Sequence, residues 1–216
     1  MNFLPFTVNP KKTTLKFKKK YSYKEQILTL FLVTFLITIT TFLSRFILSY
    51  FNLEITQIGF PEKNISYFLM GVILAPVLEE FIFRAPLKFT KRNLWFFCIG
   101  YIYLVSRFIY KSNSIYGVIG ILSLTLVLIY LYKYRVYKTH FKLNVIIYLS
   151  ALIFSAIHFQ NLDFDYTSTI GALTYAFPIF FGGLVLSYLR LKYSLLAAII
   201  FHSLHNLVAY AFFYFS

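Results

Sequence analysis

Long apolar stretches dominate the chain, and short polar or basic segments separate them. A helix needs about 20 apolar residues to cross the hydrocarbon core of a bilayer, whereas the strands of a membrane barrel alternate over about ten residues. The continuous runs therefore predict an all-α transmembrane helical bundle. The predicted spans are the seven segments 26–49, 65–89, 94–110, 114–132, 143–160, 168–189 and 194–215.

Composition favours a membrane protein over a soluble one. Of the 216 residues, 59% are hydrophobic and 13% are charged. A soluble domain is about 45–50% apolar and about 25% charged. The length fits one membrane domain, residues 26–216, preceded by a basic arm, residues 1–25. The single cysteine, Cys98, lies inside an apolar run and is expected to be a small packed residue.

Basic residues are distributed unevenly along the chain. There are 21 lysines and arginines against 7 acidic residues, and most of them fall in the arm 1–25 and in every second connection between spans. This is the pattern of cytoplasmic loops, so no nucleic-acid partner is expected and the N-terminus is predicted to be cytoplasmic. The arm is interpreted as a topology signal, and anchoring to anionic lipid is the alternative. Arg45 and Arg107 lie near span ends, where long side chains reach the interface.

Ionisable side chains inside a predicted span cost at least a few kcal/mol, so each one requires a reason. In the second span, Glu80 and Arg84 are four residues apart, share a helix face and can neutralise each other. Glu79 lies about 100° further round the helix, so it needs another partner or a hydrated cavity. Pro76, one turn earlier, can free a backbone carbonyl.

Two further spans carry isolated polar side chains. The fifth span ends with His158, four residues after Phe154, and the seventh holds His202 and Asn206 one turn apart. From the predicted cytoplasmic ends of their spans, Glu79 lies at a depth of about 15 Å, His202 at about 12 Å and His158 at about 22 Å. Helix tilt can absorb part of this mismatch, which is the weakest point of the predicted geometry.

Taken together, these residues resemble three sequence motifs of a known family. Glu79-Glu80-x-x-x-Arg84, Phe154-x-x-x-His158 and His202-x-x-x-Asn206 follow one another in the order found in the CPBP family. This family contains the type II CAAX prenyl endopeptidases and their bacterial relatives, also called Abi proteins. The resemblance covers residues 65–210. The chain departs from the family pattern at Ala85-Pro86, where glycine is common, and in the two extra spans between the first two motifs.

The resemblance implies hydrolysis of a peptide bond inside the membrane. Glu79 would be the general base for a water molecule that His158 positions, and His202 with Asn206 would donate to the oxyanion. The supporting residues would be Glu80, Arg84 and His205. The expected substrate is a membrane-anchored peptide or protein. The expected location is a bacterial inner membrane, with the site open to the cytoplasm.

A zinc-dependent version of the same reaction would use Glu79, His158 and His202 as ligands and leave one position for water. We favour the metal-free version because Asn206, beside His202, is a poor metal ligand and a good oxyanion donor. Two non-proteolytic alternatives stay open. One is a membrane immunity or secretion-accessory protein, and the other is a small proton-coupled transporter. The absence of repeats and of paired broken helices argues against the transporter.

Overall fold

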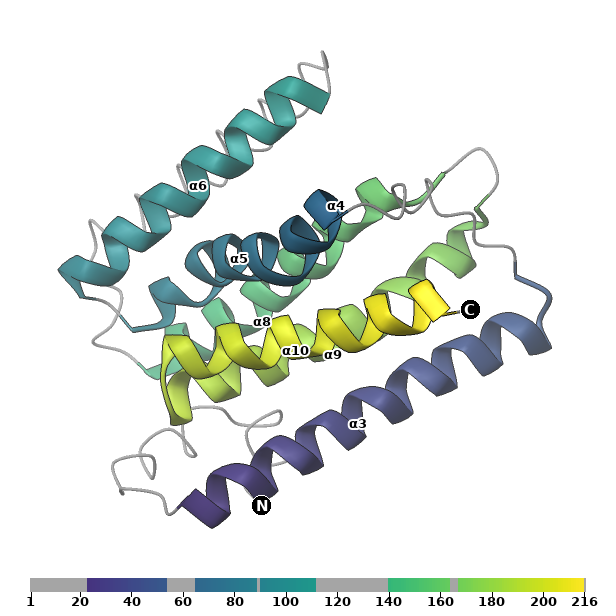
Figure 1. The fold of residues 1–216 in the computed structure, drawn as a ribbon, viewed down its shortest axis with the longest axis horizontal. Coiled ribbons are helices and arrows are strands. Elements are labelled where there is room, and N and C mark those ends of the chain that lie inside the picture. The colour runs from purple at the N-terminus through teal and green to yellow at the C-terminus, as the bar shows by residue number, and fades with distance from the viewer. Residues whose placement is uncertain (1–22, 54–64, 89, 112–139, 164–166, 216) are drawn as a thin grey trace.

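The computed structural model describes residues 23–53, 65–88, 90–111, 140–163 and 167–215. Within these ranges the chain is helical and contains no extended strand, which confirms the all-α prediction (Figure 1). The long helices are α3 (Tyr23–Tyr50), α6 (Lys91–Lys111), α8 (His140–Ile157), α9 (Thr169–Lys192) and α10 (Leu195–Phe215).

Three helices are long and apolar enough to cross a bilayer, over Ile27–Tyr50, Leu143–Asn161 and Thr169–Lys192, and α10 adds the shorter apolar stretch Leu195–Ala211. These four coincide with the predicted first, fifth, sixth and seventh spans. Helix α6 occupies the position of the predicted third span but is not among these apolar helices. The predicted fourth span, 114–132, and most of the arm 1–25 lie outside the described residues. The count of seven therefore stays a prediction.

The predicted second span is not one continuous α-helix. It consists of α4 (Ile65–Leu69), the π-helix η1 (Met70–Leu74), α5 (Ala75–Phe83) and the 3-10 helix η2 (Ala85–Leu87). In η1 the N–H of Ala75 reaches the carbonyl of Met70, five residues back. In this register Pro76 would donate next, to Gly71, and proline has no N–H. The Gly71 carbonyl accepts instead from Asn206 Nδ2 of α10, at 2.9 Å.

Helix α9 repeats this arrangement at its internal proline. Pro178 cannot donate to the carbonyl of Thr174, four residues back. Ser44 of α3 donates its hydroxyl to that carbonyl at 2.7 Å. Each proline therefore leaves a carbonyl that a side chain from another helix satisfies. Such satisfaction is required in hydrocarbon, where no water can replace the lost bond.

Helix α9 is the centre of the bundle and contacts α3, α8 and α10. Its second half, from Gly183 to Leu191, is buried throughout. Helix α6 lies on the far side of α5 from α3 (Figure 1). The rings of Phe81 and Phe96 stack between α5 and α6, and a Cβ on Gly100 would lie 2.8 Å from the Leu78 carbonyl oxygen. Glycine at position 100 thus permits this close approach.

Basic side chains of α9 meet the start of α3 and the end of α5. Lys192 Nζ donates to Thr29 Oγ1 at 3.0 Å, and Arg190 Nε donates to the carbonyl of Arg84 at 3.1 Å. We call this end of the bundle the basic end. Arg190 was expected in a loop between spans, but α9 continues to Lys192 and Arg190 is buried. Its hydrogen bond to the Arg84 carbonyl is the physical reason for its burial.

Candidate active site

Glu80 and Arg84 form the ion pair that their spacing predicts. Arg84 Nη1 lies 3.5 Å from Glu80 Oε1, and both side chains are completely buried. Arg84 Nη2 also donates to the carbonyl of Gly183 in α9 at 3.2 Å. The guanidinium lies over the ring of Phe154 in α8, 4.2 Å from its centroid. One arginine therefore joins α5 to both α8 and α9.

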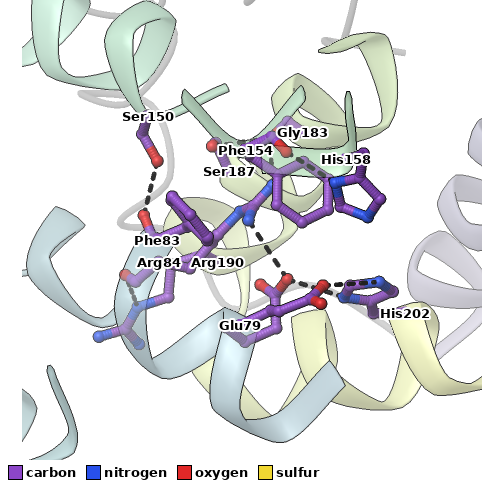
Figure 2. Close-up of polar contacts among 11 residues, drawn as sticks. Glu79, Phe83, Arg84, Ser150, Phe154, His158, Gly183, Ser187, Arg190 and His202 are labelled. Atoms are coloured by element: carbon purple, nitrogen blue, oxygen red, sulfur yellow. Dashed lines mark hydrogen bonds and ion pairs between the residues drawn. The ribbon is translucent and has the colours of Figure 1, made fainter. Parts of the chain in front are cut away.

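His202 of α10 lies between the two adjacent glutamates. Its Nδ1 is 3.0 Å from Glu80 Oε1, and its Nε2 is 3.7 Å from Glu79 Oε2 (Figure 2). Glu79 is 24% exposed, whereas Glu80 is fully buried. The imidazole thus faces a buried carboxylate with one ring nitrogen and a partly exposed carboxylate with the other.

The bond between Glu80 and His202 is not among the sequence predictions. Periodicity shows that Glu80 and Arg84 share a face of α5. It does not show which of two adjacent carboxylates faces a helix that follows more than a hundred residues later. The sequence analysis gave His202 a role at the oxyanion or, in the zinc alternative, as a metal ligand. The structure adds that Glu80 orients it.

His158 stands at the start of η4 (His158–Asn161), where α8 tightens into a 3-10 helix. Its Nδ1 lies 2.7 Å from the carbonyl of Phe154, and because a carbonyl only accepts, Nδ1 carries the proton. The ring of Phe154 packs against His158 and His202, with centroids 4.8 and 5.8 Å apart. Figure 2 shows His158 beside Phe154, above Glu79 and His202. Among the described residues, Glu79 contacts His202 and His158 contacts Phe154, and no hydrogen bond or ion pair joins Glu79 to His158.

A cavity of about 640 Å³ lies between α3, α9, α10 and the end of α8. Four of the predicted site residues line it, namely His158, His202, His205 and Asn206. His158 and His202 therefore share one space despite the predicted difference in depth. Glu79 does not line the cavity, but it lies 3.7 Å from His202, which does. The wall on α3 runs from Ile37 to Leu48, which is the half of α3 away from the basic end. Opening toward the basic end stays a prediction.

Two polar residues that were not predicted to belong to the site donate hydrogen bonds to carbonyls at the end of α5. Ser150 of α8 donates to the carbonyl of Phe83 at 2.8 Å, and Arg190 donates to that of Arg84. These carbonyls lie in the last turn, where a helix lacks internal donors. Positive charge concentrates here. Lys88, beyond η2, lies near Arg190. An isolated serine in an apolar run was the only sequence signal for Ser150.

Gly183 allows Arg84 to fit between α8 and α9. A Cβ at this position would lie 3.1 Å from Ala151 and 3.3 Å from Arg84 Nη2. At Gly182, which lines the cavity, a Cβ would meet nothing within 4 Å. Of this glycine pair, Gly183 therefore lies at a close helix contact and Gly182 does not.

The zinc alternative was tested against the positions of its ligands. Within the described part of the chain, no group of three or more His, Cys, Asp and Glu side chains is arranged to hold a metal ion. Glu79, His158 and His202 therefore do not fit a zinc site in this arrangement, and no step is assigned to a metal.

Comparison with known proteins gives one family. Residues 61–208 match the family described as "Type II CAAX prenyl endopeptidase Rce1-like". The match covers most of the chain and includes all three motifs, whereas α3 precedes it. Comparison with curated proteins and with solved structures gives no match.

Proposed function

Because the chain belongs to the Rce1-like family of type II CAAX prenyl endopeptidases, we propose that it hydrolyses a peptide bond of a membrane-anchored substrate within the bilayer. The observation that carries the proposal is that His202 of α10 faces Glu79 of α5 and shares one cavity with His158, at the end of α8. The two imidazoles also pack against the Phe154 ring. Buried groups of this kind are expensive in a membrane and mark functional sites.

In the proposed first step, Glu79 and His158 activate a water molecule. His158 uses Nδ1–H for the Phe154 carbonyl, so its Nε2 is left as a hydrogen-bond acceptor. A water molecule that donates one hydrogen to His158 Nε2 and the other to Glu79 directs its lone pair at the substrate carbonyl. Glu79 takes the proton as the C–O bond forms and later gives it to the leaving amide nitrogen.

His202 and Asn206 are proposed to stabilise the oxyanion. His202 commits Nδ1–H to Glu80, and in its protonated form it carries a second donor at Nε2. Asn206 uses one amide hydrogen for Gly71, which leaves the other available. An oxyanion donor of this type is worth about 2.7–4 kcal/mol of transition-state stabilisation.

Glu80 and Arg84 would act through His202 in this scheme. A buried carboxylate that fixes the orientation of an imidazole and stabilises its protonated form is the arrangement of a Ser-His-Asp triad. Here Glu80 would take that part, with Arg84 holding Glu80 in place. His205, which lines the cavity one residue before Asn206, would be a neighbouring polar group.

The proposed setting is a multi-pass protein of a bacterial inner membrane, with the N-terminus and the basic end on the cytoplasmic side. Its partners would be the bilayer and a membrane-anchored peptide or protein. The family description names prenyl endopeptidases, and a prenyl group on this substrate is part of the proposal. The uneven distribution of basic residues supports the orientation.

The proposal is tested with the purified full chain in lipid nanodiscs and a lipid-anchored fluorogenic peptide. We expect Glu79→Gln and His158→Ala to lower kcat by about 10²–10⁴-fold, since each removes a group that handles the water. The thermal unfolding midpoint should stay near that of wild type. Glu25→Gln, an exposed glutamate near the start of α3, is the matched control and should retain activity.

Two outcomes would contradict the proposal. If wild type and Glu79→Gln release product at the same rate, the observed hydrolysis does not come from this site. If wild type cleaves no lipid-anchored peptide, the non-proteolytic accessory or immunity function is favoured. A chelator added to the wild-type assay should leave the rate unchanged, and a loss that zinc restores would revive the metal-dependent version.

A further inference from the structure

Three basic side chains gather at the basic end of the bundle without an acidic partner of their own. Lys88, beyond η2, interacts electrostatically with Arg190 of α9, and Arg190 interacts with Arg92 of α6. Within the described ranges none of the three forms an ion pair. Glu80, the carboxylate that acts on Arg190, is already paired with Arg84. The three like charges therefore repel one another unless an anion lies among them.

Arg190 is the most buried member of this basic cluster. The residue is 6% exposed, and its Nε donates to the carbonyl of Arg84 at 3.1 Å (Figure 2). In the part of the chain that the structure describes, this is the one hydrogen bond that the guanidinium makes. A guanidinium has five N–H donors, and leaving buried donors without acceptors is costly. The remaining donors of Arg190 therefore favour an acceptor from outside the chain.

The start of α6 adds to the positive field. Arg92 is exposed in the first turn of this helix, and the turn contains no acidic residue. The N-terminus of a helix carries a partial positive charge, which disfavours a neighbouring cation and favours an anion. A phosphate group is an anion that such a turn binds readily, because free backbone N–H groups point toward it.

The surface of α6 beside the cluster fits the rest of a lipid molecule. Trp95, the single tryptophan of the chain, lies one turn after Arg92 on the same side of α6 and is 65% exposed. Ile99 and Ile102 continue this exposed side along the helix. Tryptophan prefers the interface between headgroups and hydrocarbon. A molecule with a phosphate at one end and an acyl chain at the other matches both the charge and the apolar stripe.

We propose that Lys88, Arg92 and Arg190 bind the phosphate group of an anionic lipid, whose acyl chain lies along the exposed side of α6. None of these three residues lines the cavity, so the lipid site is separate from the candidate active site. Arg190 also donates to the carbonyl of Arg84, and Arg84 pairs with Glu80. The bound lipid therefore stabilises the end of the helix that carries the two glutamates.

The test measures quenching of Trp95 fluorescence by brominated lipids, with the full chain reconstituted in bilayers. Because the chain has one tryptophan, the signal reports on the lipid beside α6. Brominated phosphatidylglycerol should bind there about tenfold or more tightly than brominated phosphatidylcholine, since each basic residue near the phosphate contributes about fivefold. Arg92→Gln should lower this preference about fivefold, and Lys88→Gln/Arg92→Gln should remove most of it. Lys24→Gln, exposed at the start of α3, is the matched control and should retain it.

The variants keep the bond between Arg190 and the Arg84 carbonyl, so their unfolding midpoint in phosphatidylcholine should stay near that of wild type. Equal quenching of wild type by the two lipids overturns the assignment. An equal loss of preference in Lys24→Gln also overturns it, because the effect would then belong to the overall surface charge. Inorganic phosphate should relieve the quenching no more than chloride at equal ionic strength, and a larger effect would assign the site to free phosphate instead. The readout needs no peptide cleavage, so it stands or falls independently of the proposed hydrolysis.

Discussion

The candidate site has a packed face and an open face, and two pairs of identical residues that are adjacent in sequence are divided between them. On the packed face, Glu80 and Gly183 are buried against Arg84. On the open face, Glu79 is partly exposed beside His202, and Gly182 lines the cavity. A helix turns by about 100° per residue, so neighbours in sequence fall on different faces. The same residue type thus stabilises the bundle at one position and is left accessible at the next.

Within the first motif, Glu80 and Arg84 stabilise the packing, whereas Glu79 is the residue proposed to act in the reaction. The packed face joins three helices through a charge pair, a carbonyl and an aromatic ring. The open face keeps a carboxylate and two imidazoles next to a space that a peptide could fill. Variants of the paired residues should therefore separate losses of stability from losses of turnover.

The largest separation is expected between Arg84→Leu and Glu79→Gln. Removing Arg84 leaves the buried charge of Glu80 without its cation, and breaking such a pair costs about 3–5 kcal/mol. Glu79→Gln should leave the unfolding midpoint unchanged while turnover is lost. The double variant Glu80→Gln/Arg84→Leu should recover part of the stability, because it removes both charges. Thermal unfolding in nanodiscs measures all three. Equal midpoints for the two single variants would refute the distinction between the faces.

A smaller effect on stability is expected at the glycine pair. In Gly183→Ala the new methyl group meets Ala151 and the Arg84 guanidinium, and overpacking of this kind costs about 1–3 kcal/mol. Gly182→Ala is the matched control, because its methyl group enters open space and alanine favours a helix by about 0.5–1 kcal/mol over glycine. Should Gly182→Ala prove the more destabilising of the two, the assignment of the packed face is wrong.

The smallest effect concerns the boundary between the two faces. Pro76→Ala restores an N–H that can reach the Gly71 carbonyl, which releases Asn206 from its bond. We expect stability to hold and kcat to fall by about tenfold at constant KM, because the oxyanion donor loses its orientation. In an Asn206→Ala background the same substitution should have no further effect on kcat. Independent, additive losses would show that Pro76 acts by another route.

The helical fold class followed from the apolar runs, and the polar residues of the candidate site could be picked out within them. Isolated polar residues in apolar runs are easily recognised because placing them in lipid is energetically unfavourable. Glu79, His158 and His202 could therefore be identified from the sequence. The pairing of Glu80 with Arg84 followed from helical spacing alone. The freed carbonyl behind Pro76 was also predicted, but its partner was not, because Asn206 arrives from a helix distant in sequence.

Other features had no signal in the sequence. Arg190 was interpreted as a loop residue because the predicted sixth span ends at residue 189, yet it is buried and donates to the carbonyl of Arg84. The second span was predicted with a perturbation at Pro76, but a proline does not show that a π-helix will absorb it. Helix α6, at the predicted third span, is less apolar than α3 or α9.

The bond between Asn206 and Gly71 has a consequence for assembly. Helix α10 is apolar around almost its whole circumference. Apolar contacts with lipid and protein are therefore similar on every side and do not fix the rotation of the helix about its axis. The polar contacts of His202 and Asn206 select one rotational setting. A descendant that gave up hydrolysis would then be free to lose Glu79. It would still need Glu80, His202 and Asn206 to insert its last helix the right way round.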